Sequence, residues 1–151
     1  METPFAAGMV IYAKDIERLG RFYSELADLP IVQRERDFAV LESPACQLVV
    51  VAMPADIARG IVIAAPPVRR ENTAIKPCFA VTELAAARQA ADRLGGGLDD
   101  MKREWVFRGY RVCDGYDPEG NVFQLRSPAM DGRAPYAPME HSARCGSLHR
   151  L

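Results

Sequence analysis

The feature that most constrains this chain is an internal repeat at a separation of 68 residues. Four positions of the first copy return in the second with similar chemical character: Ile11 as Phe79, Asp15 as Glu83, Ile16 as Leu84 and Leu26 as Leu94. Each copy has the order strand, helix and three strands, and one copy alone would hardly bury its own helix and sheet. The repeat therefore predicts an α+β fold in which two pseudo-repeated βαβββ modules share a core.

The first copy begins at residues 8–15, whose alternating apolar pattern is typical of a strand. Asp15 is suited to cap the helix that follows. Apolar residues then recur three and four positions apart and form one helix face: Ile16, Leu19, Phe22, Tyr23 and Leu26. Pro30 ends this helix. Three strands are predicted after it, at residues 31–33, 38–41 and 47–52.

The second copy begins with a predicted strand at residues 77–81. Thr82 or Glu83 then opens an alanine-rich helix, which ends at the three glycines 95–97 because glycine permits the backbone conformation of a helix C-terminus. Three strands follow again, and they are predicted at residues 105–107, 110–113 and 121–125.

Composition shifts divide the chain into four segments: a first module at 1–53, a linker at 54–74, a second module at 75–128 and a C-terminal tail at 129–151. The linker contains Pro66 and Pro67, and its residues 60–65 are a candidate edge or linker strand. The tail is rich in glycine, proline and serine, which indicates either disorder or a segment laid across a partner.

Charge and apolar patterning exclude several classes of partner. The formal net charge is -1, and its acidic and basic residues are mixed, so neither nucleic acid nor a membrane surface is an expected partner. The apolar runs are too short to cross a bilayer, and no secretory leader is recognised. The four cysteines are scattered without metal-binding spacing and are interpreted as reduced thiols, most of them buried. We expect a soluble, cytoplasmic protein.

At this point the chain resembles the vicinal oxygen chelate superfamily, which contains glyoxalases, bleomycin-resistance proteins and extradiol dioxygenases. The resemblance spans residues 8–127 and rests on KDIERLGRFYSELADLP, on KPCFAVTELAAARQAADRLGG and above all on DGYDPEGNVFQLRSP. It implies that the two modules form a cupped, partly open mixed β-barrel with helices outside. It also implies a ligand inside the cup and a homodimer, whose modules pair either within or between chains.

Catalytic members of this superfamily typically hold a divalent metal on four inward side chains. The resemblance assigns these four positions to residues of this sequence. Seven residues before the helix starts Asp15 and Glu83 stand Gly8 and Lys76, and the last strands of the two modules supply Leu48 or Val50 and Gln124. Glycine and the apolar residues have no ligand atom, and the lysine ammonium carries only hydrogen-bond donors. The histidines His141 and His149 both lie in the tail. We therefore expect no metal site and no cofactor.

Strand alternation predicts which side chains face the cup, because residues two apart in a strand share a face. Val122, Gln124 and Arg126 face inward on the last strand by this rule. The predicted ligand-binding residues are Tyr12, Lys76, Trp105, Phe107, Arg111 and Gln124. Alternative interpretations stay open for most of them. Lys76 extends to solvent at the mouth of the cup and Gln124 hydrogen-bonds the backbone, the rings of Trp105 and Phe107 belong to the core, or Arg111 is a solvated surface charge.

The leading hypothesis is a metal-free small-molecule binding protein, for instance one that sequesters an antibiotic or a metabolite. The first alternative is a glyoxalase-like lyase or isomerase that acts on a carbonyl substrate, with Lys76 as acid, base or electrostatic clamp. The second is a non-catalytic interaction module whose cup is filled by side chains. No nucleophilic triad can be built, since neither histidine belongs to the two modules.

Overall fold

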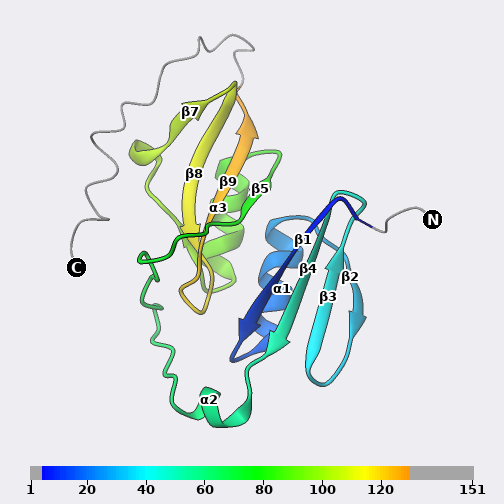
Figure 1. The fold of residues 1–151 in the computed structure, drawn as a ribbon. Coiled ribbons are helices and arrows are strands. Elements are labelled where there is room, and N and C mark those ends of the chain that lie inside the picture. Colours follow the sequence, from blue (N-terminus) through cyan, green and yellow to red (C-terminus); the bar gives the residue numbers. More distant parts are fainter. Residues whose placement is uncertain (1–4, 130–151) are drawn as a thin grey trace.

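The strands of each module form a sheet of their own in the computed structural model, which describes residues 5–129. The first sheet has the order β1 (Ala7–Ala13), β4 (Cys46–Ala52), β3 (Phe38–Glu42) and β2 (Ile31–Arg34). The second has the order β5 (Cys78–Ala80), β9 (Val122–Pro128), β8 (Tyr110–Tyr116) and β6 (Gly97–Leu98), and β7 (Trp105–Phe107) also pairs with β8. This arrangement confirms the α+β fold with two related modules, in which β6 and β7 both pair with β8 and together take the place that β2 has beside β3 (Figure 1).

The two modules repeat the same pairing. In each, the first strand lies parallel to the last one, β1 to β4 and β5 to β9. A parallel pair requires a crossover connection, and the helices α1 (Ile16–Leu26) and α3 (Leu84–Arg93) begin these connections. No strand pair joins the two sheets within residues 5–129, so the predicted barrel is open between them.

Both helices begin where the sequence predicts, and α3 also ends near the predicted glycines, whereas α1 ends at Leu26, before Pro30. The side chain of Asp15 caps α1 by accepting a hydrogen bond from the backbone N–H of Arg18 at 3.0 Å. Glu83 is the N-cap of α3, and Gly95, two residues after its last residue, has a φ of 89°. A glycine adopts that left-handed conformation without steric cost, which explains the helix end.

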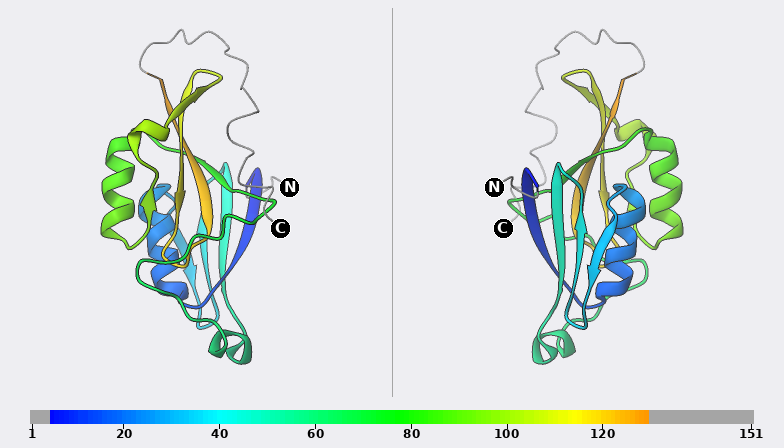
Figure 2. Two further views of the ribbon diagram at one scale, coloured as in Figure 1. Left: turned by 90° about the vertical axis from the view of Figure 1, so that its left-hand side faces the viewer. Right: turned by 90° about the vertical axis from the view of Figure 1, so that its right-hand side faces the viewer.

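The two helices lie on one side of the sheets, and the core lies between helices and strands (Figure 2). Aromatic rings from both modules meet there. The Tyr23 ring lies 5.7 Å from the Phe79 ring, and the Phe22 ring lies 5.8 Å from the Phe123 ring, measured between centroids. Because one core includes side chains of both modules, each module buries apolar surface that it could not bury alone.

The turn between β8 and β9 also joins the modules, through two buried carboxylates. Asp117 is fully buried, and one of its oxygens accepts a hydrogen bond of 2.7 Å from the Tyr23 hydroxyl of α1. Glu119 accepts hydrogen bonds from the backbone N–H groups of Lys14 and Asp15 at 2.8 and 3.0 Å. The second module thereby holds the chain at the point where the first helix begins.

Burial shifts the ionisation of this pair. It raises the pKa of Asp117, although hydrogen bonds from Tyr23 and Asn121 oppose the rise. Burial also raises the pKa of Tyr23 well above its ordinary value, and the neighbouring Asp117 carboxylate raises it further. The phenol therefore stays a hydrogen-bond donor to Asp117 at neutral pH.

Several expectations are corrected by the structure. Residues 60–65 form no strand, because this linker segment has no neighbouring strand to pair with, and Val62 is 89% exposed. A short helix, α2 (Ala55–Arg59), precedes it and was not predicted. In the second module, β6 and the 3-10 helix η1 (Met101–Arg103) were missed, since both are too short to have a periodic pattern. The tail beyond residue 129 lies outside the described residues.

The cysteines are also less buried than expected. Cys113 is buried, Cys46 is half-buried and Cys78 is exposed. Cys78 belongs to a strand of three residues whose alternation directs its neighbour Phe79 into the core and leaves the thiol on the other face. None of the helices within residues 5–129 has the length and apolar character to span a membrane.

We expect Tyr23→Phe to lower the free energy of unfolding by about 1.5–3 kcal/mol, because the buried Asp117 carboxylate loses a hydrogen-bond donor. Tyr12→Phe removes the same atom from a side chain that is 61% exposed and should change the stability little. Urea unfolding of both variants provides the comparison. Equal stabilities would contradict the proposed role of this hydrogen bond.

Candidate ligand-binding site

The second sheet has one face toward α3 and one face away from it. Cys113 and Leu125 pair directly and belong to the core, so their neighbours Asp114 and Gln124 point to the opposite face. The same alternation and register assign further residues to it. We call this surface the open face, and its residues include Cys78, Ala80, Trp105, Phe107, Tyr110, Val112, Asp114, Tyr116, Val122, Gln124 and Arg126.

Charged and polar side chains on the open face form one continuous hydrogen-bonded chain. The Lys76 ammonium lies 2.7 Å from Oδ2 of Asp114, and Nε2 of Gln124 donates to Oδ1 of Asp114 at 3.2 Å. The Oε1 atom of Gln124 then accepts two hydrogen bonds from Arg126, at 3.0 and 2.9 Å. We call these four residues the Lys76–Arg126 cluster.

Aromatic side chains border this cluster. The guanidinium of Arg126 lies 5.1 Å from the centroid of the Phe107 ring, within the range of a cation–π interaction. Trp105 pairs with Val112, which in turn pairs with Arg126, so the indole lies on the same face. Both aromatic residues are half-buried, and the face therefore combines planar apolar surface with fixed polar groups.

The linker limits the open face at its other end. It passes the second sheet on the side away from α3 (Figures 1 and 2), and the Arg69 guanidinium lies 5.3 Å from the centroid of the Tyr116 ring. Arg69 also forms ion pairs with Asp99 and Glu71. The linker is fixed again at Gly120, whose carbonyl accepts from the N–H of Arg70 at 2.8 Å.

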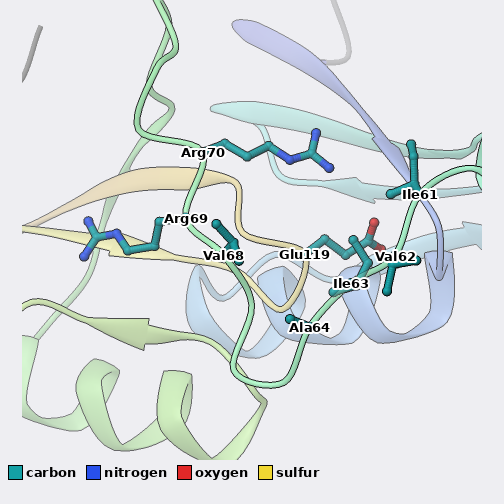
Figure 3. A pocket seen from close by; sticks show the side chains of 8 residues that line it. All are labelled: Ile61, Val62, Ile63, Ala64, Val68, Arg69, Arg70 and Glu119. Carbon is teal, nitrogen blue, oxygen red and sulfur yellow. The ribbon is translucent and has the colours of Figure 1, made fainter. Parts of the chain in front are cut away.

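A separate hollow of about 250 Å³ lies between the linker and Glu119 (Figure 3). Its lining residues are Ile61, Val62, Ile63, Ala64, Val68, Arg69, Arg70 and Glu119. A neighbouring hollow of about 530 Å³ is lined by Lys14, Asp15, Ile16, Arg18, Arg36, Ala52, Ile63 and Glu119. Neither includes a residue of the Lys76–Arg126 cluster, and the Glu119 carboxylate common to both already accepts two backbone hydrogen bonds.

Residues 8–126 match the sequence profile of the glyoxalase-like domain family. The match covers both modules and more than half of the chain. The chain belongs to this family, and thus to the vicinal oxygen chelate superfamily. No protein with curated annotation matches the sequence.

Solved structures of the same superfamily have this fold at low sequence identity. The fosfomycin resistance protein FosX from Listeria monocytogenes is 12% identical, with a TM-score of 0.57 over 89% of this chain and 100% of that one. A glyoxalase/bleomycin resistance protein from Albidiferax ferrireducens T118 is 17% identical, with a TM-score of 0.57 over 84% of this chain and 100% of that one. A bleomycin resistance determinant encoded on the transposon Tn5 is 16% identical, with a TM-score of 0.51 over 83% and 98%. These similarities support the fold.

The structure brings four of the six predicted site residues of this glyoxalase-like chain together. Lys76, Gln124, Trp105 and Phe107 all belong to the open face or its rim. Tyr12 instead lies on the first sheet, where its side chain points away from the core. Arg111 occupies the face of β8 opposite to Asp114, and its Nη1 atom lies 3.6 Å from Glu104.

Strand register corrects one of the four superfamily metal positions. Val10 and Cys78 are equivalent in the repeat, and they pair with Val49 and Gln124, respectively. Val49 therefore corresponds to Gln124, whereas the expected Leu48 and Val50 are buried on the helix side of the first sheet. The positions expected from the sequence, Leu48 and Val50, each lie one residue away from Val49. A shift of one residue moves the side chain to the other face of the strand.

The residues at these positions do not fit a divalent metal. Gly8 and Val49 have no ligand atom, and the Lys76 ammonium is paired with Asp114. The Oε1 atom of Gln124 is the single ligand of the type that such a metal binds, and it already accepts two hydrogen bonds from Arg126. Within residues 5–129, no group of three or more His, Cys, Asp or Glu side chains could hold a metal. His141 and His149 lie outside the described residues.

Sequence reasoning missed Asp114, the residue that connects the cluster. The strand was predicted to end at Cys113, and β8 continues to Tyr116. If the predicted strand is extended by one residue past Cys113, its alternation places Asp114 on the same face as Val112. The sequence pattern therefore contained the signal for this residue. Arg126 was expected to face inward, but its stacking on Phe107 could not be read from the sequence.

We expect elemental analysis of the purified protein to find far less than one equivalent of divalent metal, because three of the four superfamily positions lack a usable ligand atom. Dialysis against EDTA should leave the thermal unfolding midpoint unchanged. A stoichiometric metal that EDTA removes, with loss of stability, would contradict our interpretation of the four positions.

We expect Asp114→Asn to change the free energy of unfolding by less than about 1 kcal/mol, because its ion pair with Lys76 is partly exposed to solvent. Glu119→Gln makes the same chemical change at a buried carboxylate and should cost about 1–3 kcal/mol. Urea unfolding of the two variants tests this contrast. A larger loss for Asp114→Asn would assign the cluster to stability and argue against a binding role.

Proposed function

We propose that this glyoxalase-like protein binds a small organic ligand, without a metal, on the open face of the second sheet. The observation that carries the proposal is the Lys76–Arg126 cluster, four polar side chains that hold one another in fixed positions beside Phe107. Binding sites combine apolar surface with a few oriented polar groups, and this face offers both.

The position of the cluster supports a role in binding over a role in folding. Its side chains point away from the hydrophobic core, and those of Lys76 and Asp114 are 39% and 21% exposed. Ion pairs with that exposure contribute little to stability. A ligand that covers the face would remove water from the same groups and strengthen their interactions with it.

A role in sequestration or resistance agrees with the names of two structural neighbours, a fosfomycin resistance protein and a bleomycin resistance determinant. Fold similarity at these identities does not transfer a ligand. The lyase or isomerase alternative depends on Lys76, and the contact with Asp114 favours an electrostatic clamp among the roles considered for it. Loss of turnover in Lys76→Ala, with the fold intact, would favour that alternative over simple binding.

The expected homodimer remains a prediction. It is supported by apolar side chains that the first sheet leaves exposed on its side away from α1, among them Val10 at 57% and Tyr12 at 61%. Exposed apolar surface of this kind is often covered by a partner. A second copy is the occupant that the superfamily resemblance implies.

We expect planar aromatic compounds, tested as a panel that includes 2-naphthoate and 2-naphthamide, to change the fluorescence of Trp105, the one tryptophan of the chain. Bound ligand should also slow alkylation of the exposed Cys78 thiol, which lies on the open face, and not that of Cys46, which packs against the core. Mass spectrometry of the two cysteine peptides measures this protection.

Phe107→Ala should weaken binding about tenfold, because it removes an aromatic surface next to the cluster. Ile57→Ala shortens an exposed apolar side chain in α2, far from this face in sequence, and should leave the affinity unchanged. If no compound changes the fluorescence or protects Cys78, the proposed binding function is wrong.

A further inference from the structure

The charges on the open face do not cancel. The Lys76–Arg126 cluster contains two cations, Lys76 and Arg126, and one carboxylate, Asp114. Both oxygens of Asp114 are occupied, one by Lys76 and the other by the amide of Gln124. Arg126 forms no ion pair with any acidic residue within residues 5–129, so its positive charge has no counterion in this part of the chain.

Arg126 is nevertheless held in one orientation. Its Nε and Nη2 atoms both donate to Oε1 of Gln124, and its Cζ atom lies over the Phe107 ring. No hydrogen bond from its Nη1 atom is formed within the part of the chain that the structure describes. A half-buried guanidinium that is already ordered loses little conformational entropy when it binds a further acceptor.

The field of this guanidinium acts on the same face of the sheet. Burial raises the pKa of the Cys78 thiol, and the nearby Arg126 charge opposes that rise, while Asp114 adds to it. Cys78 pairs with Gln124 in the strand register. The pKa of its thiol therefore depends on the charges of Arg126 and Asp114 on the open face.

We propose that the ligand of this site is an organic monoanion whose carboxylate binds Arg126 and whose planar part lies along Phe107 and Trp105. This inference rests on the proposed function, since it specifies the chemical class of ligand for the same face. A carboxylate supplies the missing counterion and accepts charge-assisted hydrogen bonds from the guanidinium. A cationic ligand would meet two positive charges and only one carboxylate, which is already paired.

Isothermal titration calorimetry with 2-naphthoate and 2-naphthamide tests the proposal, because the two probes share one ring system and differ in charge. We expect the naphthoate to bind about tenfold more tightly at low salt, as charge-assisted hydrogen bonds are stronger than neutral ones. The preference should shrink when the salt concentration is raised. Protection of Cys78 by each probe locates the binding on the open face.

Arg126→Gln should abolish the preference, so that both probes bind with similar affinity. Arg126→Lys keeps the charge and loses the planar fork, and it should show an intermediate preference. Arg93→Gln removes the same charge from the outer helix α3, where the side chain is 62% exposed, and should keep the full preference. Circular dichroism confirms that each variant is folded.

Two results would overturn the inference and leave the binding function intact. One is equal affinity of the two probes for the unaltered protein, with Cys78 protected by both. The other is a tenfold preference that persists in Arg126→Gln. If neither probe binds or protects Cys78, the proposed function fails together with this inference.

Discussion

Two buried carboxylates hold the two halves of this molecule in one arrangement. Asp117 and Glu119 belong to the last turn of the second module, and their hydrogen-bond donors include Tyr23 and the backbone at the start of α1. An unpaired carboxylate at such a position would cost several kcal/mol. The most stable arrangement of the two modules is therefore the one in which these donors reach the carboxylates. The shared aromatic core forms in the same arrangement.

This arrangement also determines which surfaces are available for function. Because α1 and α3 cover one side of the two sheets, each strand presents every second residue to the other side. On the second sheet those residues include the charged Asp114 and Arg126, whereas on the first they include the exposed Val10 and Tyr12. The linker, fixed at Gly120 and stacked on Tyr116, limits the second surface at one end. The fold thus leaves two chemically different open surfaces on one molecule.

Much of the fold was predictable because its signals are local. The cap of Asp15 and the apolar face of α1 follow from side-chain chemistry within a few residues. Prediction failed where no local signal exists. The short strand β6 and the helix α2 have too few residues for a pattern, and the position equivalent to Gln124 proved to be Val49 because register depends on a neighbouring strand.

The sequence by itself determined the two modules and the residue types at the superfamily metal positions, where the side chains of Gly8 and Lys76 offer no lone pair to a metal at neutral pH. Only the tertiary structure decided which side chains meet. Lys76 precedes β5, Asp114 belongs to β8 and Arg126 to β9, and their order along the chain does not reveal their contact through Gln124. Residue type is a local property, whereas the pairing of side chains across a sheet depends on strand order and register, which the shared core and the buried turn establish.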